Sequence, residues 1–221
     1  MSLNFLPSPP VLIAYAIILL TSFPVHEFAH AWVADRFGDD TPRVNGRLTL
    51  NPLAHLDPIG TIMMILVGFG FAKPVPINPY VLQRHSRSAP MLVSLAGPMS
   101  NLLMAIFASL FFRLGLVSTD AIYIAPVGIL PNIAQILVIF IRINLLLMLF
   151  NMIPLFPLDG EKVLDYFLPP SAARVLESIR PYGPMILLAL VFILPRLFGI
   201  DLLGTVILPA LNNLTRLLIG V

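Results

Sequence analysis

The sequence predicts an all-α polytopic membrane protein with about four to six transmembrane helices, a short membrane-associated β-hairpin and a re-entrant loop. Of its 221 residues, 58% are hydrophobic and 11% are charged, and the mean hydropathy is +0.93. Soluble domains carry charge on about a quarter of their residues, so this composition excludes that class. We expect a single membrane-embedded domain over 1–221, with a core at about 10–168 and C-terminal helices at 171–221.

Charge and cysteine content narrow the partners of the chain. It has no cysteine, which excludes a disulfide framework and a thiolate metal site. The net charge of +2 and the scattered basic residues do not indicate nucleic acid, and they are typical of loops that follow the positive-inside rule. The expected surrounding is therefore the lipid bilayer, with no nucleic acid bound.

The first transmembrane helix is expected from about Pro10 to Phe37. Basic residues follow closely at Arg36 and Arg43, and none precedes the helix. This asymmetry predicts an N-terminus outside the cell and puts the end of the helix near the cytoplasmic face. Pro24 removes one backbone donor, and it either opens the helix to water by a kink or is an ordinary membrane-helix proline.

Two short elements are expected before the second span. Asn45-Gly46 lies between short alternating segments, which predicts a β-hairpin over Arg43–Leu50. The apolar run Gly60–Phe71 is too short to span a bilayer and has basic residues on both sides, which predicts a re-entrant loop that returns to the cytoplasmic face. The proline-rich stretch Lys73–Pro79 is then expected to be extended.

Three further spans are expected at about Pro90–Leu116, Asn132–Ile153 and Tyr182–Phe198. The loop between the first two of them carries one acid and no lysine or arginine, which places it outside. The segment Leu202–Leu218 contains a proline and an asparagine pair, so it is either a fifth span or an interfacial helix. Arg142 falls in mid-span, where it is expected to line a polar cavity or to pair with an acid.

The strongest chemical signal is the sequence His26-Glu27-Phe28-Ala29-His30 near the end of the first span. On a helix, this spacing puts two imidazoles on one face with a glutamate beside them. Such a set suits two ligands of a catalytic zinc ion and the general base that activates its water. An ionisable cluster within a span is costly, so it indicates a functional site.

A tetrahedral catalytic zinc needs a third protein ligand, for which the chain offers few candidates. His85 lies in a basic loop and is expected to be solvated, while His55 is expected to be structural. Asp57 is expected to form a turn or cap before a proline. Asp159 follows an apolar helix that prolines break, at the depth inferred for the two histidines, so it is either a metal ligand or the N-cap of the next helix.

Three motifs occur in order with short intervals, and together they resemble the site-2 protease family of intramembrane zinc metalloproteases. The motifs are His26–His30, Ala96–Asn101 and Asn151–Gly160. The stretches Gly46–Pro52 and Phe71–Pro76 are similar to compact prokaryotic members that lack a PDZ domain. The resemblance covers most of the chain, and the first motif joined to the third is far more specific than the first alone.

The resemblance implies a metal centre with assigned roles. His26, His30 and Asp159 would hold one zinc ion per chain, with Glu27 as general base and later as proton donor to the leaving amine.

The resemblance also bears on three neighbouring residues. Asn151 would contact the extended substrate or the developing oxyanion, or else satisfy carbonyls that a nearby proline frees. Asn101 would line the site or hydrogen-bond between helices. Glu161 stands where many relatives carry a small residue, and it adds negative charge near the metal.

The substrate must unwind before hydrolysis, because the carbonyls of a helix are hydrogen-bonded and shielded. Unpaired backbone groups are costly in lipid, so the enzyme is expected to pair them. Strand addition to the edge of the Arg43–Leu50 hairpin would supply those bonds, which makes Leu48 and Thr49 candidate substrate-binding residues.

The sequence therefore predicts an intramembrane zinc metalloendopeptidase that cleaves within or near transmembrane segments of single-span membrane proteins, as in regulated intramembrane proteolysis. It is expected in the prokaryotic cell membrane with its active site nearer the cytoplasmic face, under the control of a regulatory partner or of substrate trimming. An alternative is a catalytically inactive zinc-binding scaffold or chaperone, against which the intact Glu27 argues. A metal transporter would present polar ligands along several spans, whereas here they converge at one end.

Overall fold

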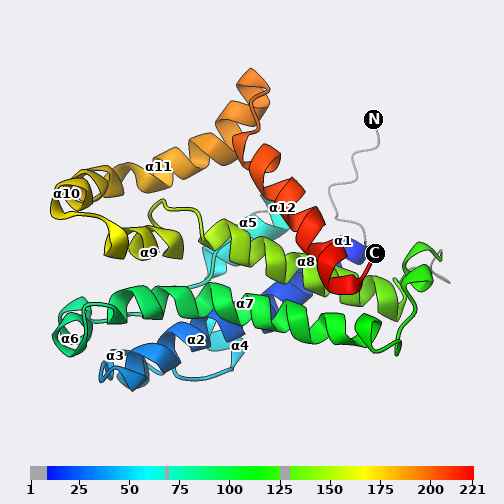
Figure 1. Ribbon diagram of the computed structural model, residues 1–221, viewed down its shortest axis with the longest axis horizontal. Helices are drawn as coiled ribbons and strands as arrows, with labels where there is room; N and C mark the ends of the chain where they lie inside the picture. The colour runs from blue at the N-terminus through cyan, green and yellow to red at the C-terminus, as the bar shows by residue number, and fades with distance from the viewer. Residues whose placement is uncertain (1–8, 68–69, 125–129) are drawn as a thin grey trace.

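The computed structural model describes residues 9–67, 70–124 and 130–221, and in these ranges the regular structure is helical (Figure 1). Four helices of the described chain are long and apolar enough to cross a membrane. They are Leu12–Arg36, Ala89–Arg113, Ile133–Asn151 and Pro170–Phe198. The predicted all-α class is confirmed, and helices long enough to span occur at the first three predicted ranges. The fourth candidate span extends further toward the N-terminus than the predicted Tyr182.

The first span is one continuous rod of three helical pieces. It consists of α1 (Pro9–Ile17), a π-helical turn (Ile18–Ser22) and α2 (Phe23–Arg36). Pro24 stands at the start of α2, where its missing N–H would otherwise break the α-helical pattern, and the preceding turn widens instead. This puts the wide turn just before the histidine motif.

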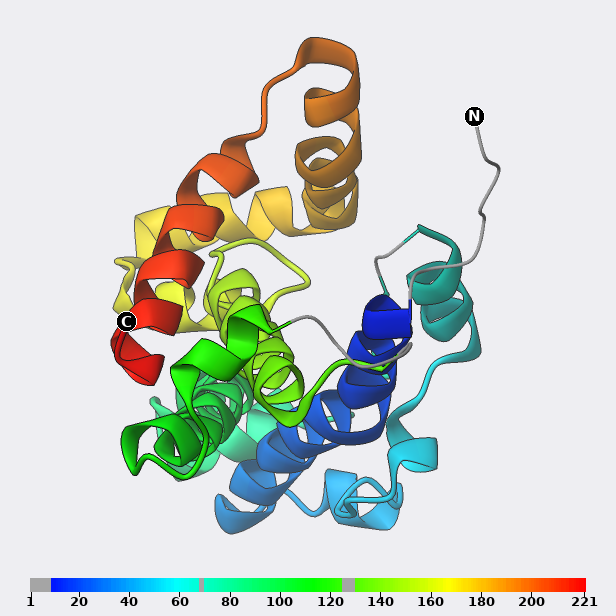
Figure 2. The same ribbon diagram turned by 90° about the vertical axis from the view of Figure 1, so that its right-hand side faces the viewer.

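The bundle is built on α7 (Ala89–Arg113) and α8 (Ile133–Asn151), which lie side by side. The first span packs on one side of this pair, and α12 (Leu202–Ile219) packs on the other (Figure 2). Small residues let the backbones approach closely, as is usual between membrane helices. The core between α7, α8 and α12 consists of Ala105, Ala108, Phe112, Ala134, Ile141, Leu145, Leu211 and Ile219.

Two arginines hold α12 against this pair. Arg142 donates from Nη1 to Asn212 Oδ1 at 3.0 Å, so its partner is an amide of α12 and not an acid. Arg113 donates from Nε to the carbonyl of Leu218 at 2.8 Å and also bonds the carbonyl of Leu217. The guanidinium of Arg113 thereby satisfies carbonyls that the C-terminus of α12 leaves unpaired.

The predicted hairpin at Arg43–Leu50 is wrong, because a helical turn, α3 (Thr41–Val44), takes the place of its first strand. The Asn45-Gly46 pair closes this turn. Gly46 has φ +66 and donates to the carbonyl of Arg43, and the next N–H, that of Arg47, donates to Pro42. The pair Asn-Gly is favoured both after a helix and in a hairpin turn, because glycine adopts the left-handed conformation that each requires.

The chain next forms two short helices and then returns close to the place where they begin. After α4 (Pro52–His55) comes α5 (Pro58–Val67); residues 68 and 69 of the predicted re-entrant loop lie outside the described residues. The returning segment pairs Ala72 with Leu56 in an isolated antiparallel bridge, which brings both ends of the excursion together. Of the stretch predicted to be extended, Lys73–Asn78 has no regular secondary structure, Asn78 has extended dihedral angles and Pro79 begins a helix. A path through the bilayer for this excursion stays a prediction.

Short helices gather at one end of the bundle, at the left of Figure 1. Residues 114–124, which follow α7, lie at the opposite end, together with the C-terminus. From the left end, α11 (Gly183–Leu188) continues into a π-helical segment (Ala189–Phe198). The helices at the left end are α3, α6 (Pro79–His85), α9 (Asp159–Phe167) and α10 (Pro170–Ile179).

Candidate metal centre

Helix α2 carries the first two members of the centre. His26 and His30 are four residues apart and therefore lie on the same face of α2, and both are buried. Their Nε2 atoms are 3.0 Å apart, and the two rings meet edge to face. The spacing in the sequence thus produces the close pair of imidazole nitrogens that the motif predicts.

Asp159 joins them from a distant part of the chain. Its Oδ2 lies 3.2 Å from His26 Nε2 and 3.3 Å from His30 Nε2. Asp159 is the first residue of α9 and its N-cap is Leu158, so the alternative role of Asp159 as a cap is wrong. A Cβ at Gly160 would lie 2.3 Å from the carbonyl oxygen of Met152, so glycine lets the start of α9 approach the end of α8 this closely.

These three residues fit a zinc ion. Ligand atoms at about 2.0–2.1 Å from a tetrahedral zinc are separated from one another by ~3.3 Å, which is close to the distances between His26 Nε2, His30 Nε2 and Asp159 Oδ2. Oδ2 is buried and, apart from the two nearby Nε2 atoms, has no hydrogen-bond partner among the described residues, as expected of an atom kept for a metal. Two imidazoles and one carboxylate are also the donor set of zinc peptidase sites, which keep a fourth position open.

The ionisation of Asp159 suits a ligand as well. Burial raises the pKa of this carboxyl, but the adjacent His30 and His26 lower it by more, so the net shift is well below the usual range. In the metal-free centre, these neighbours favour the ionised carboxylate, which is the form of Asp159 that a metal binds.

The other ring nitrogens of the histidines are fixed from α7. His30 Nδ1 lies 2.7 Å from the carbonyl oxygen of Val93, which can only accept, so Nδ1 carries the proton and Nε2 is free to bind. His26 Nδ1 lies 2.6 Å from Asn101 Oδ1. Asn101 is fully buried and bonds Asn144 of α8, so it orients His26 from behind and does not line the cavity.

Gly97 of α7 borders the point where the three ligand atoms meet. A Cβ placed there would lie 2.4 Å from His30 Nε2 and 2.6 Å from His26 Nε2. No side chain fits at this position, so glycine keeps open the space that a metal ion would take. The role of Gly97 was not predicted from the Ala96–Asn101 motif, because its closeness to the two histidines depends on how α7 packs against α2.

Glu27 faces the same cavity as the ligands. This cavity has a volume of about 900 Å³ and is lined mainly by apolar side chains of α5, α8, α11 and α12. Glu27 Oε2 accepts a hydrogen bond from the backbone N–H of Val75 at 3.2 Å, so the segment that follows α5 holds its carboxylate. The carboxylate therefore meets the three ligand residues in one space.

The remaining predicted residues lie in different places. Asn151 lines the cavity, and its Nδ2 donates to the carbonyl of Leu147 in its own helix. Leu48 and Thr49 are not part of the cavity lining. The carbonyl of Thr49 instead bonds Nε2 of His55, a fully buried histidine that fixes the loop as a structural residue.

Two further charged or aromatic positions are also explained. His85 is exposed and stacks edge-on against Phe37, at 5.6 Å between ring centroids, and so lies outside the centre. Glu161 is buried and pairs with Arg180, with Oε1 at 2.5 Å from Nη2 and 3.0 Å from Nε. The charge of Glu161 is thus directed at an arginine.

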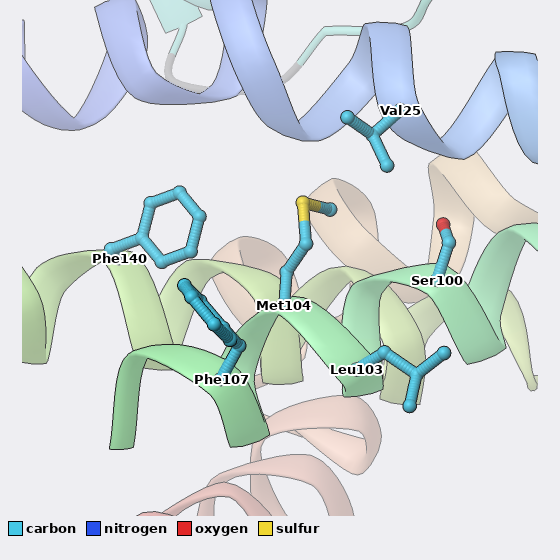
Figure 3. A pocket seen from close by; sticks show the side chains of 6 residues that line it. All are labelled: Val25, Ser100, Leu103, Met104, Phe107 and Phe140. Carbon is cyan, nitrogen blue, oxygen red and sulfur yellow. The ribbon is translucent and has the colours of Figure 1, made fainter. Parts of the chain in front are cut away.

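A second hollow, of about 330 Å³, lies between α2, α7 and α8 (Figure 3). Its lining is apolar except for Ser100, whose hydroxyl donates to the carbonyl of Gly97. This hollow therefore offers packing surface and no reactive group. It is lined by Val25, Ser100, Leu103, Met104, Phe107 and Phe140.

Comparison with known proteins agrees with this geometry. The sequence model of peptidase family M50 matches residues 14–124. The chain is 41% identical over 211 residues to "Putative zinc metalloprotease YwhC" of Bacillus subtilis, which covers 95% of this chain and 91% of that protein. It is 32% identical to two proteins named "Putative zinc metalloprotease Rip2", over 77% of this chain and 63% of the protein from Mycolicibacterium smegmatis, and over 81% and 66% for that of Mycobacterium tuberculosis. No solved structure matches.

Proposed function

Because the chain belongs to peptidase family M50, the site-2 protease family, and is a zinc metalloprotease, we propose that it hydrolyses peptide bonds within or near transmembrane segments of membrane-anchored proteins. One observation carries the proposal. The two histidines, Asp159 and Glu27 meet in one cavity whose walls include helices long enough to cross a membrane. Substrates that reach this cavity through the bilayer are themselves membrane segments.

We assign the metal to His26, His30 and Asp159, whose three ligand atoms fit a tetrahedral zinc. When bound, zinc supplies a Lewis acid that polarises the scissile carbonyl and makes water acidic enough to attack at neutral pH. Glu27 accepts the proton of the attacking water and later passes it to the leaving amine. The mainly apolar lining limits competing water, which strengthens each electrostatic contact inside the cavity.

The substrate has to lose its helical hydrogen bonds before its carbonyl can be attacked. Its freed backbone groups are costly in lipid, so the enzyme must pair them. Asn151 lines the cavity and is our candidate for contact with the extended substrate or the oxyanion. Leu48 and Thr49 stay predictions as substrate contacts, although the hairpin edge to which strand addition was assigned is replaced by α3 and a loop.

The distribution of basic residues supports an orientation of the protein in the membrane. Basic residues are concentrated around the short helices α3 and α6 and in the connection from α9 to α11, which by the positive-inside rule is the cytoplasmic side. We therefore propose a multi-pass protein of the prokaryotic plasma membrane whose centre lies nearer the cytoplasmic face. Its partners would be single-span membrane proteins and a regulatory protein that controls their access.

The decisive variant is Glu27→Gln, which removes the base and keeps the shape of the side chain. We expect it to retain zinc and to lose cleavage by about 10²–10⁴-fold, the usual contribution of general acid–base catalysis. Zinc would be measured in the purified protein by mass spectrometry, and cleavage by the release of tagged tails from a panel of co-expressed single-span proteins. Glu177→Gln, the same change at an exposed position of α10, is the matched control.

The outcomes separate the proposed protease from its alternative. A zinc-loaded wild type that cleaves none of the panel would favour the inactive scaffold or chaperone. Undiminished cleavage by Glu27→Gln would reject Glu27 as the base. Loss of zinc from this variant would show that Glu27 supports the metal site itself.

A further inference from the structure

We propose that Asn144 of α8 is a positioning residue, which acts through Asn101 to determine which ring nitrogen of His26 carries the proton, so that Nε2 keeps the lone pair for the metal. The proposal rests on the zinc site assigned above. Asn144 lies in the middle of a span and is fully buried, as is Asn101. Its Oδ1 accepts from Asn101 Nδ2 at 2.9 Å, and its Nδ2 donates to the carbonyl of Phe140 at 2.9 Å.

These hydrogen bonds have a fixed direction, because their last acceptor is a backbone carbonyl. The Phe140 oxygen can only accept, so Asn144 must turn its amide nitrogen toward it and its oxygen toward Asn101. Asn101 must then donate to that oxygen, which turns its own Oδ1 toward His26. His26 in turn must carry its proton on Nδ1, and Nε2 is left with the lone pair that a metal binds.

Without Asn144, this direction would no longer be imposed. The amide of Asn101 could then rotate by half a turn and present Nδ2 to the ring, which favours the tautomer of His26 with its proton on Nε2. That tautomer cannot bind a metal through the nitrogen that lies 3.2 Å from Asp159 Oδ2. Asn144 of α8 therefore affects metal affinity indirectly, through Asn101 of α7 and His26 of α2.

A purely structural role is the competing interpretation, because amide hydrogen bonds also join membrane helices. The two roles differ in what happens when both asparagines are removed. If Asn144 works only through Asn101, its loss has no further effect on zinc once Asn101 is gone. If each residue merely supports packing, the two losses combine.

The experiment is a double-mutant cycle on the zinc dissociation constant, measured by chelator competition in detergent. We expect Asn144→Leu to weaken zinc about 10-fold and Asn101→Leu about 10–100-fold, the usual range for residues that orient a ligand. The double variant should bind zinc as Asn101→Leu does, within about twofold. Ser109→Ala is the control, since Ser109 is a buried polar residue of α7 that bonds only the carbonyl of Ile106 in its own helix.

Other results would overturn the proposal. An unchanged zinc affinity in Asn144→Leu would do so, as would a double variant whose loss equals the product of the two single losses. Melting of the metal-free proteins shows whether each variant folds. Should Asn144→Leu fail to fold, Asn144→Asp keeps the accepting oxygen and is expected to retain zinc within about threefold, and a larger loss would contradict the role. A wild type without zinc affinity would instead reject the metal site itself.

Discussion

At the scale of single residues, there is space for the metal because Gly97 has no side chain. A Cβ at this position would lie within 2.6 Å of both ligand nitrogens. Contacts this short cannot be relieved by a flexible side-chain end, because both rings are held by hydrogen bonds from behind. Gly97 therefore belongs to the metal centre as much as the ligands do.

We predict that Gly97→Ala lowers zinc affinity by at least about 100-fold, beyond the usual effect of residues that only orient a ligand. The added methyl group would occupy the position between His26 and His30. Ser100→Ala, one turn further along α7, is the matched control and should bind zinc as the wild type does. Chelator competition measures both, and zinc affinity in Gly97→Ala close to that of the wild type would show that the site is not where we place it.

The sequence predicted the candidate ligands and base, which the structure brings together, but not the residues that shape their surroundings. His26, Glu27 and His30 were predicted because their chemistry appears in a motif with fixed spacing, whereas Asp159 became the expected third ligand only through the resemblance to the site-2 protease family. Gly97 and Asn144 were missed because their roles depend on how α7 and α8 pack against α2. A polar residue in the middle of an apolar span was the available signal for Asn144, and it indicates only that a partner exists.

At the scale of elements, an ion pair between the buried Glu161 and the partly exposed Arg180 joins the helix that carries Asp159 to the short turn that precedes α11. Glu161 lies in the first turn of α9, and Arg180 begins the short 3₁₀ turn Arg180–Tyr182 before α11. The side chain of Glu161 is 2% exposed and that of Arg180 is 38% exposed. Loss of Arg180 would leave a buried carboxylate without its partner, which is the costly way to break such a pair.

We predict that Arg180→Met destabilises the protein by about 3 kcal/mol, at the lower end of the range for broken buried pairs because Arg180 is partly exposed. The double variant Glu161→Gln with Arg180→Met should recover part of this loss, since no buried charge is left. Thermal unfolding in detergent measures both. Equal stability of wild type and Arg180→Met would mean that the pair adds nothing.

The hairpin shows why short elements were harder to predict than spans. Asn45-Gly46 was interpreted as a hairpin turn, yet it ends the helical turn α3. A hairpin turn and the end of a helix both need a residue with positive φ at this position. Contacts with distant residues therefore decide which of the two structures forms. Arg47, which is buried, donates to the carbonyls of Ala54 and Lys73 and so ties the loop to the returning segment.

At the scale of the whole molecule, the spans were predictable because apolar length is a local property of the sequence. The helices at Ala89–Arg113 and Ile133–Asn151 lie within a few residues of their predicted ranges. Their arrangement around α7 and α8, and the clamp of α12 by Arg142, depend on contacts between distant residues. The orientation of the bundle in the membrane follows from charge and can be measured.

We predict that the end of the bundle with α6 faces the cytoplasm and that the connection between α7 and α8 faces outward. The chain has no native cysteine, so single cysteines report cleanly. In intact cells, a membrane-impermeant maleimide should label Asp120→Cys and leave Gln83→Cys unlabelled, and permeabilised cells should label both. The reverse labelling pattern in intact cells would show that the protein has the opposite orientation in the membrane.

The hydrogen bond between Val75 and Glu27 has a consequence for how the enzyme can vary. The proposed ligands lie on α2 and α9 and the two histidines are oriented from α7, whereas the carboxylate of Glu27, the proposed base, is held by the segment that follows α5. The carboxylate of Glu27 therefore has a hydrogen-bond partner that the three candidate ligands do not share. Changes in the segment around Val75 can adjust the rate of hydrolysis, or its response to a given substrate, while the zinc site keeps its affinity.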